Sequence, residues 1–489
     1  MAQESAPRVE RLGGRRRLSI VDVVAQSVGF VGPVFSAAFL IPLLVGVNSS
    51  GKGAGAAAPL AVLVASLGLL GLGWIVAQYA RRIHAAGSLY EYVTDGLGER
   101  AGAAAGWLYY SGIAALGAGL AVLIGGYIAD TVQAEYGVSP LPSWAWSAIL
   151  LAGVLILLHL GVQISTRSQL VLAAVSIVVF LVFFISVIVR VGAANSHKAW
   201  VPDSSGDGWL GIAFGVLYGV LLFTGFETAA NLAEETAHPK RDIPRAVLFS
   251  VLVVSGFYLL AAYAQVAGFH FDVQAISKAS AGPVFALGGP ASAGGYGSTA
   301  VVRVLELVVL LDMLAVYIGV SVSASRGFFV LARARRLPGA LARVSASRGT
   351  PSGGIATVGV LYLAALGLTY LWPGLFALPA TPHYFAMFSW LSTFGGFAIA
   401  AIYLLMSIGA VRGLRDHPRR WAVVTASAVG IVVTIGALFG AVFKVPAPTV
   451  WAPYAALGWL AVGLVVAFVV KGRPVAGALA TEALEPGIA

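Results

Sequence analysis

Residues 223–236 read FTGFETAANLAEET and lie inside an otherwise apolar segment that begins near Trp209. A threonine, a glycine and the carboxylate of Glu227 therefore interrupt what should be a membrane-spanning helix. In hydrocarbon such an interruption leaves backbone N–H and C=O groups without partners, so it is tolerated only where protein groups or a water-filled cavity supply them. An ionisable side chain at that depth is costly, which makes Glu227 a candidate functional residue.

The composition of the chain predicts an all-α, polytopic membrane protein. Of its 489 residues, 59% are apolar and only 10% are charged, and the mean hydropathy is +0.90. Soluble domains carry about 25% charged residues. No polar stretch is long enough for a separate soluble domain, so we expect one transmembrane domain over residues 19–470, between cytoplasmic tails at 1–18 and 471–489.

Apolar runs of membrane-spanning length recur along the whole chain and predict about twelve transmembrane helices. We expect these spans at roughly 19–47, 56–80, 100–130, 143–161, 168–191, 209–235, 245–269, 299–332, 353–372, 384–410, 420–443 and 449–470.

The distribution of basic residues predicts the orientation. If the N-terminus is cytoplasmic, most of the 30 Lys and Arg residues fall in cytoplasmic loops, which is the bias that sets membrane topology. We therefore expect a multi-pass protein of the cytoplasmic membrane, with both termini in the cytoplasm. The net charge of +10 is then a topology signal and not a sign of nucleic-acid binding. The heavy use of Ala, Gly and Arg favours a bacterial source.

Several classes of function are excluded by what the sequence lacks. The chain has no cysteine, and its seven histidines are scattered without metal-ligand spacing, so we expect no metal site and no cofactor. The spans contain no paired carboxylates or nucleophile motif for an enzyme, and no Walker sequence for ATP hydrolysis. We expect no catalytic residues. A channel would need a ring of charges or stacked carbonyls, and none is visible.

A second interruption occurs in the first span. Residues 26–36 read QSVGFVGPVFS, and Pro33 cannot donate to a helix but suits the first turn of a new one. A simple proline kink would explain this span alone. The two interrupted spans, however, lie five helices apart, so the blocks that they begin have opposite orientations. Interruptions at corresponding positions of two inverted halves indicate a transporter's mid-membrane binding site. We expect repeats at about 19–191 and 209–410, with two extra helices at about 420–470.

The residues around these interruptions resemble the amino acid–polyamine–organocation (APC) superfamily of permeases, which have a five-plus-five inverted-repeat fold like that of the leucine transporter. The most specific match is the sixth span, with Gly225-Phe226-Glu227, Glu234-Glu235-Thr236, Pro239, Arg241, Pro244 and Arg245. Moderate matches are Ala86–Tyr90, Gly161–Arg167, Ser325-Arg326, Leu331–Arg333, Leu337-Pro338 and Gly349–Pro351. Together they cover spans 1 to 10.

The resemblance implies that a small-molecule substrate binds between the two broken helices. By motif position the first break comprises Gly29, Phe30, Val31, Gly32 and Val34, and the free N–H groups of Val31, Gly32 and Val34 would receive a carboxylate, as helix N-termini do. Pro33 stands where the family usually has a glycine, so one donor is missing.

In the sixth span, the resemblance places the other half of the substrate site at Leu222, Phe223, Thr224, Gly225 and Phe226. The carbonyls of Leu222, Phe223 and Thr224 would end a half-helix with a negative dipole and suit an ammonium group. Phe223 or Phe226 could close over the substrate as a gate, although aromatic side chains in a span more often serve packing.

Coupling is assigned to five residues: Glu227, Asp312, Ser176, Ser321 and Ser325. Glu227 could couple transport to a proton or act as a gate, could cap the second half of the sixth span, or could do both. Asp312 is a second costly intramembrane acid, which could meet an amine, move a proton or pair with a structural partner. Ser176 stands where some proton-coupled relatives carry a lysine.

Ser321 and Ser325 could supply hydroxyl ligands to sodium, or let helices pack closely. Beyond the break, Asn231, Glu234 and Glu235 follow at helical spacing on the face of Glu227, and we expect the acids to meet the basic loop of residues 240–245.

These observations predict a secondary active transporter that takes up an amino acid by alternating access, with a proton as the coupling ion and sodium as the alternative. Substrate exchange and the transport of a polyamine or simple amine remain open. Pro33 and Asp312 favour an amine that lacks a carboxylate.

Overall fold

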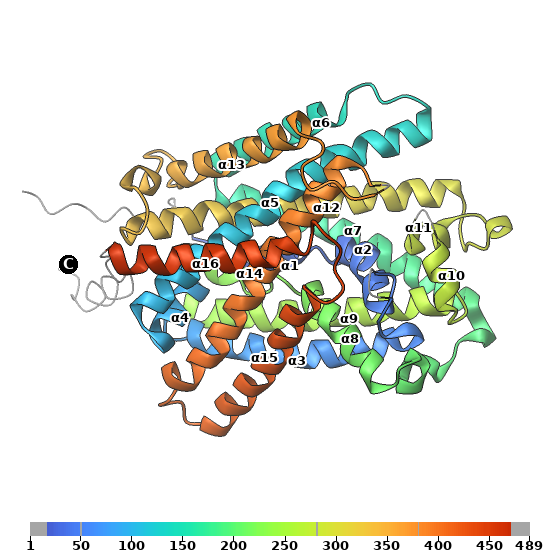
Figure 1. Cartoon of the computed structure of the whole chain (residues 1–489), viewed down its shortest axis with the longest axis horizontal. Helices are drawn as coiled ribbons and strands as arrows, with labels where there is room; N and C mark the ends of the chain where they lie inside the picture. Colours follow the sequence, from blue (N-terminus) through green and yellow to red (C-terminus); the bar gives the residue numbers. More distant parts are fainter. Residues whose placement is uncertain (1–16, 49–50, 280–281, 380, 471–489) are drawn as a thin grey trace, which may run out of the picture.

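The structure is a computed structural model, and it describes residues 17–48, 51–279, 282–379 and 381–470 (Figure 1). The expected terminal tails lie almost entirely outside these ranges. In the described residues, strand pairing is limited to two isolated bridges. The first half of the chain forms the helices α1 (Ile20–Val31), α2 (Pro33–Val45), α3 (Ala58–Ala80), α4 (Leu89–Leu97), α5 (Glu99–Tyr136), α6 (Ser143–Leu160), α7 (Val162–Val191) and α8 (Trp209–Leu222). The second half forms α9 (Pro239–Gly268), α10 (Val273–Lys278), α11 (Pro283–Gly288), α12 (Thr299–Arg333), α13 (Ser352–Leu371), α14 (His383–Gly413), α15 (Arg420–Gly440) and α16 (Trp451–Val469).

The described helices account for the expected membrane spans. Ten helical segments are long and apolar enough to cross a membrane. The two remaining expected ranges hold α8, which is a shorter apolar helix of 14 residues, and α12, which has 35 residues. The prediction of an all-α polytopic protein is therefore confirmed.

The surface of the bundle is apolar where helices face outward. In α7 the exposed side chains recur every three or four residues, at Val171, Val175, Val178, Val182, Ile185 and Val189. The opposite face of the same helix, which includes Gln169, Ser176 and Phe180, is buried. A helix with its apolar stripe outward and its polar side chains inward suits a lipid environment.

Both predicted interruptions are present. Between α1 and α2, Gly32 adopts the left-handed conformation with φ +58°, and Pro33 begins the new helix. In the sixth span, α8 ends at Leu222, residues 223–227 form turns, and the chain continues as the 3₁₀ helix η5 (Thr228–Glu235). Gly225, with φ +105°, lies in the middle of those turns. Spans 1 and 6 are therefore discontinuous, as the sequence predicts.

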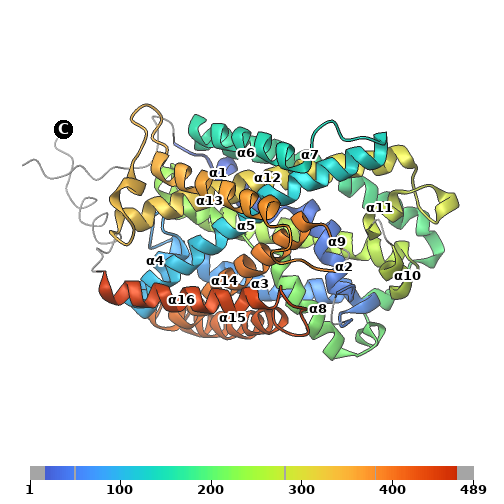
Figure 2. The same cartoon turned by 45° about the horizontal axis from the view of Figure 1, so that its top comes forward.

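The long helices α5 and α12 pass through the centre of the bundle and pack against each other. Every residue of α12 from Ala315 to Ala332 is buried. The two last helices, α15 and α16, lie on one flank, away from α6 and α7 (Figure 2). The helices before them form two blocks of five spans, each of which begins with a broken helix.

Both ends of the described chain lie at the same end of the bundle. Arg17 donates to the carbonyl of Glu234 at 2.7 Å, and Arg336 donates to the carbonyl of Val470. Arg82 and Arg100 lie there too, against the ends of α14 and α16. We call this region, defined by these four arginines and the helix ends that they contact, the basic end; it is on the left in Figure 1.

Candidate functional site

The two broken helices contact each other at their breaks. The Ser27 hydroxyl of α1 donates to the carbonyl of Phe226 at 2.7 Å and accepts from the N–H of Ala229 at 3.0 Å. The Phe30 ring lies so close to Gly225 that a Cβ there would come within 1.9 Å of the ring. These contacts bring together residues about 200 positions apart in the sequence, and they satisfy backbone groups that the second break leaves free.

The start of α2 receives a side chain from α12. The N–H groups of Val34 and Phe35 donate to Asp312 Oδ2 at 2.9 and 2.8 Å. Asp312, for which the sequence indicates no clear partner, therefore binds the end of a half-helix that the resemblance assigns to the substrate. The N–H of Gly32 donates to Val28 O within α1, in which Val31 is the last residue.

The carbonyl end of α8 is also occupied by protein groups. The Tyr258 hydroxyl of α9 donates to Leu222 O at 2.7 Å, and the Phe226 N–H donates to Phe223 O at 3.1 Å. Thr224 is half-exposed, whereas Leu222 and Phe223 are buried. The half-helix ends are thus closed by internal partners in this conformation.

Glu227 is held by two tyrosines from helices far apart in the sequence. Its carboxylate accepts hydrogen bonds from Tyr109 of α5 at 2.9 Å and from Tyr403 of α14 at 2.6 Å, and all three residues are fully buried. The Tyr403 hydroxyl also accepts from the N–H of Gly225 at 3.4 Å. The start of η5 has no side-chain cap. Each carboxylate oxygen can accept a second hydrogen bond, so capping of free N–H groups and proton coupling both stay predictions for Glu227.

The second half of the sixth span is a 3₁₀ helix, so the expected helical spacing beyond Glu227 is wrong. With three residues per turn, Asn231 and Glu234 do not share a face with Glu227. A 3₁₀ helix rises about 2.0 Å per residue against about 1.5 Å for an α-helix, so η5 extends further toward the basic end.

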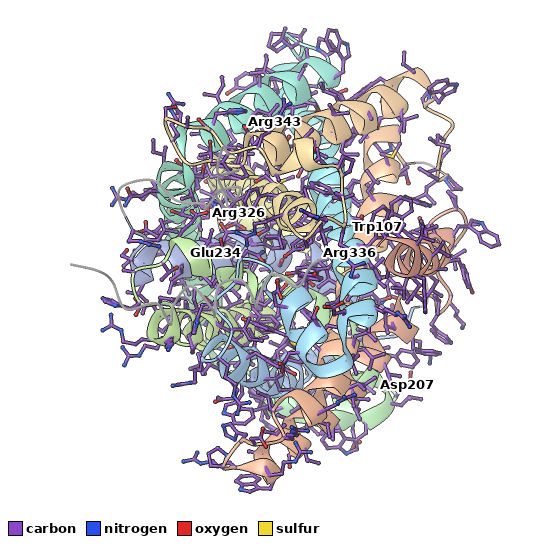
Figure 3. The ribbon with its side chains drawn as sticks, turned by 90° about the vertical axis from the view of Figure 1, so that its left-hand side faces the viewer. Trp107, Asp207, Glu234, Arg326, Arg336 and Arg343 are labelled. Atoms are coloured by element: carbon purple, nitrogen blue, oxygen red, sulfur yellow. The ribbon has the colours of Figure 1, made fainter. Side chains whose placement is uncertain are left out.

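The acids at the end of η5 bind α12 and not the loop of residues 240–245. Glu235 pairs with Arg326 at 2.9 Å, and Glu234 pairs with Arg333. The expectation that these acids meet the basic loop is therefore wrong; Arg241 of that loop pairs instead with its neighbour Asp242. Figure 3 looks at the basic end and shows Glu234 and Arg326 near the middle of the bundle. These ion pairs join η5 to α12 at the basic end.

The two candidate gate residues are packed inside the bundle. The Phe223 ring meets Tyr258 edge-on at 5.2 Å, and the Phe226 ring lies 5.5 Å from that of Tyr403. Both phenylalanines are buried. On the other side of the breaks, the half-exposed Phe35 contacts Phe388 of α14, with ring centroids 6.2 Å apart.

The candidate serines donate to backbone carbonyls. Ser176 donates to Leu172 O and, across to α12, to Val308 O. Ser321 donates to Tyr317 O at 2.6 Å and lies 3.2 Å from the Tyr362 hydroxyl, while Ser325 donates to Val322 O. Among the described residues, no cluster of His, Asp or Glu could hold a metal ion.

Sequence reasoning did not assign a role to a pair of glutamines beside the first break. Gln26 donates to Gly319 O at 3.0 Å and to the Ser323 hydroxyl at 3.1 Å, and Gln169 donates to Gln26 Oε1 at 3.3 Å. Gly29 lies against Gln169, where a Cβ would approach Oε1 to 2.7 Å. The sequence does contain a signal for this pair, because each glutamine places a primary amide inside an apolar span, and burying an amide without a hydrogen-bond partner is costly. The pair ties α1, α7 and α12 together.

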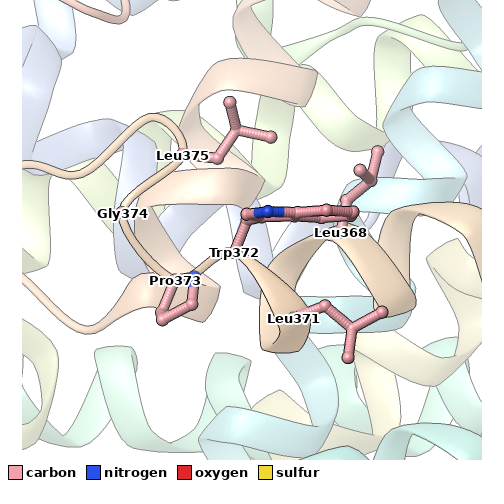
Figure 4. Close-up of a pocket in the computed structure, with 6 residues that line it drawn as sticks. All are labelled: Leu368, Leu371, Trp372, Pro373, Gly374 and Leu375. Atoms are coloured by element: carbon pink, nitrogen blue, oxygen red, sulfur yellow. The ribbon is translucent and has the colours of Figure 1, made fainter.

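Two surface hollows formed by described residues lie away from the breaks. One of them, at the end of α13, is formed by the apolar residues from Leu368 to Leu375 (Figure 4). A smaller one lies between α5 and α12 and holds the ion pair of Glu135 with Arg303. Neither contains a residue of the two breaks.

Comparisons with known proteins identify the family of the chain and a similar fold. A family model described as amino acid permease matches residues 23–469. The chain is 23% identical over 331 residues to a branched-chain amino acid permease of Bacillus subtilis (strain 168), a match that covers 62% of this chain and 66% of that protein. It is 24% identical to the branched-chain amino acid permease of Lactococcus lactis subsp. cremoris (strain MG1363), with 70% and 74% covered. The chain therefore spans about two thirds of the length of the Bacillus protein.

Among solved structures, a mutant of the Eremococcus coleocola manganese transporter superposes with a TM-score of 0.58 at 11% identity. The superposition covers 94% of this chain and 98% of that one. At this identity the likeness shows a common fold alone.

Proposed function

Since the chain belongs to the amino acid permease family, we propose that it is a secondary active transporter that moves a small solute with an amino group across the cytoplasmic membrane by alternating access. The observation that carries the proposal is the contact between the two broken helices, where Ser27 links α1 to the carbonyl of Phe226 and the N–H of Ala229. Half-helix ends that meet at the middle of a bundle are the usual substrate site of such folds. An amino acid is the candidate that the relatives support, and a simple amine is the candidate that Asp312 supports.

A proton is the proposed coupling ion. Glu227 is an acid buried between two tyrosine hydroxyls and adjacent to the second break, and buried intramembrane acids serve as proton carriers in pumps and transporters. Sodium is less well supported, because the hydroxyls of Ser321 and Ser325 donate to carbonyls of their own helix. Exchange of one solute for another is the alternative mechanism.

We further propose that the basic end faces the cytoplasm, with both termini there. The arginines at that end support this orientation through the positive-inside rule. The ion pairs of Glu234 and Glu235 with α12 would then close the cytoplasmic side.

Uptake by the full chain in liposomes tests the proposal. Radiolabelled amino acids and amines are offered with and without an inward proton gradient, and an ionophore that collapses the gradient is the control. Accumulation that requires the gradient is the expected result. Uptake that ignores the gradient but needs internal solute would replace proton symport by exchange, and no uptake of any compound would overturn the transport proposal.

A further inference from the structure

Every backbone N–H in the first turn of α2 donates to an acceptor within the protein. Gly32 donates to Val28 O, Pro33 has no N–H, Val34 and Phe35 donate to Asp312, and Ser36 donates to Gly32 O at 2.9 Å. A helix N-terminus normally offers its first N–H groups to an anion. Here that anion is supplied by the protein, so a substrate carboxylate would have to displace Asp312.

The position of Asp312 is built into the packing of α12 against the break. Gly32 has no side chain, and a Cβ there would come within 2.1 Å of Val316 and 3.3 Å of Asp312 Oδ2. The glycine thus lets α12 approach close enough for Asp312 to reach the two N–H groups. Asp312 is fully buried at this point.

The second carboxylate oxygen of Asp312 is left without a partner. Oδ1 is buried and accepts no hydrogen bond from the described residues. None of the ion pairs among those residues involves Asp312. A buried carboxylate oxygen without a donor is costly, so a cationic donor is the group that would satisfy it.

The neighbouring half-helix adds to the preference for a cation. α8 packs against α2, and its carbonyl end carries the negative end of the helix dipole. Although Leu222 O accepts a hydrogen bond from Tyr258, the dipole of α8 would favour a cation that binds at the start of α2.

We propose that the transported solute is a small organic amine without a carboxylate, and that its ammonium group binds Asp312 Oδ1 while Oδ2 stays bound to Val34 and Phe35. This inference rests on the proposed transport function. It assigns to Asp312 the place at the start of α2 that the substrate's own carboxylate would otherwise fill.

Matched pairs of compounds test the inference, because an amino acid and its decarboxylated amine differ only in the carboxylate. The pairs are alanine with ethylamine, leucine with 3-methylbutylamine, lysine with 1,5-diaminopentane and phenylalanine with 2-phenylethylamine. The melting temperature of the purified full chain and its uptake in liposomes are measured for both members of each pair. We expect at least one amine to raise the melting temperature of the chain more than its amino acid does. The same amine should be taken up at least about tenfold better than its amino acid.

Two variants locate the effect at residue 312. Asp312→Asn keeps an oxygen for the N–H groups of Val34 and Phe35 but removes the charge, and it should weaken amine binding at least about tenfold. Asp312→Ala frees both N–H groups and should let amino acids stabilise the chain. Glu306→Gln, six residues earlier in the same helix, is the matched control and should keep the preference for amines.

The outcomes separate this inference from the transport proposal. If amino acids are bound and taken up while their amines are not, the inference is wrong and the transport function stands. If amines are preferred but Asp312→Asn binds them equally well, the role of Asp312 is wrong. If no compound of either series is bound or taken up, both proposals fail. The comparison of pairs on the unmodified chain is decisive even where a variant does not fold.

Discussion

Glu235 and Arg326 form a buried, two-pronged ion pair between η5 and α12, with Nε 2.9 Å from Oε1 and Nη2 3.1 Å from Oε2. Both side chains are less than 5% exposed. A charge pair of this kind is stable only while both partners are present, since the loss of one leaves the other buried and uncompensated at a cost of about 3–5 kcal/mol.

Arg326→Gln should therefore open the basic end. The uncompensated Glu235 carboxylate is best relieved by water, so the variant should favour conformations in which η5 is hydrated. The chain has no native cysteine, and Ala230→Cys places one reporter at a fully buried position of η5. A charged thiol reagent should label Ala230→Cys faster when Arg326→Gln is also present.

Arg335→Gln is the control for this experiment, because it removes an exposed charge at the same end of the bundle. It should leave the labelling rate unchanged. Equal labelling of Ala230→Cys with and without Arg326→Gln, in protein that elutes as a single folded species, would contradict a role of the ion pair in closing this end.

Glu227→Gln tests the proposed proton coupling. The amide keeps an oxygen that can accept from Tyr109 or Tyr403 but cannot carry the charge. We expect gradient-driven accumulation in liposomes to fall at least about tenfold, while exchange of internal for external solute persists. The two assays are run on the same vesicles, so the exchange rate controls for the amount of folded protein.

Tyr403→Phe tests whether coupling depends on how the Glu227 carboxylate is positioned or on its ability to bind a proton. It removes the 2.6 Å hydrogen bond to Glu227 and the acceptor of the Gly225 N–H, and it should lower stability by about 1–3 kcal/mol without abolishing coupling. Coupled transport by Glu227→Gln at the normal rate would show that the coupling proton binds elsewhere.

The two breaks could be predicted because their cause is local. Gly32 with Pro33, and Thr224 with Gly225, interrupt apolar runs that would otherwise be continuous helices. Polar atoms in a membrane span are costly unless other groups satisfy them, so such interruptions indicate a functional site. The partners of the polar groups could not be predicted. Asp312 reaches Val34 across 278 positions of sequence, and Glu227 meets two tyrosines that any aromatic count would assign to packing. The ion pairs were misassigned because the sequence favoured the nearest basic loop over α12.

Gly225→Ala should disrupt the contact between the breaks. A Cβ at residue 225 would lie 1.9 Å from the Phe30 ring, and the backbone there has φ +105°, which a side chain rarely tolerates. We expect a loss of several degrees in melting temperature and of uptake. Gly256→Ala in α9 is the matched control: no atom lies within 4 Å of its Cβ, so the change should be neutral or stabilising by up to about 1 kcal/mol. Equal stability of the two variants would contradict the close contact.

Glu91 should make the stability of the chain depend on pH. It lies in α4, outside the membrane-spanning helices, and is 3% exposed. Burial raises the pKa of Glu91 from its ordinary value of 4.5 to about 7, and Arg333 only partly offsets this effect. Below the ordinary pKa both the folded and the unfolded chain bind the proton. Between the two values only the folded chain keeps it, and above about 7 the folded chain carries a buried charge. The free energy of unfolding should thus fall as pH rises through this window.

Glu91→Gln removes the titrating group and retains a polar side chain of the same shape. At about pH 8 the variant should therefore be more stable than the unmodified chain, by up to about 3 kcal/mol, and the difference should disappear toward about pH 4.5. Melting temperatures in detergent at both ends of the window measure it. Glu99→Gln, which removes an exposed acid at the start of α5, should change the melting temperature by a similar small amount at both values. A Glu91→Gln variant that is less stable than the unmodified chain at about pH 8 would mean that the Glu91 charge is stabilised by Arg333 more than burial penalises it.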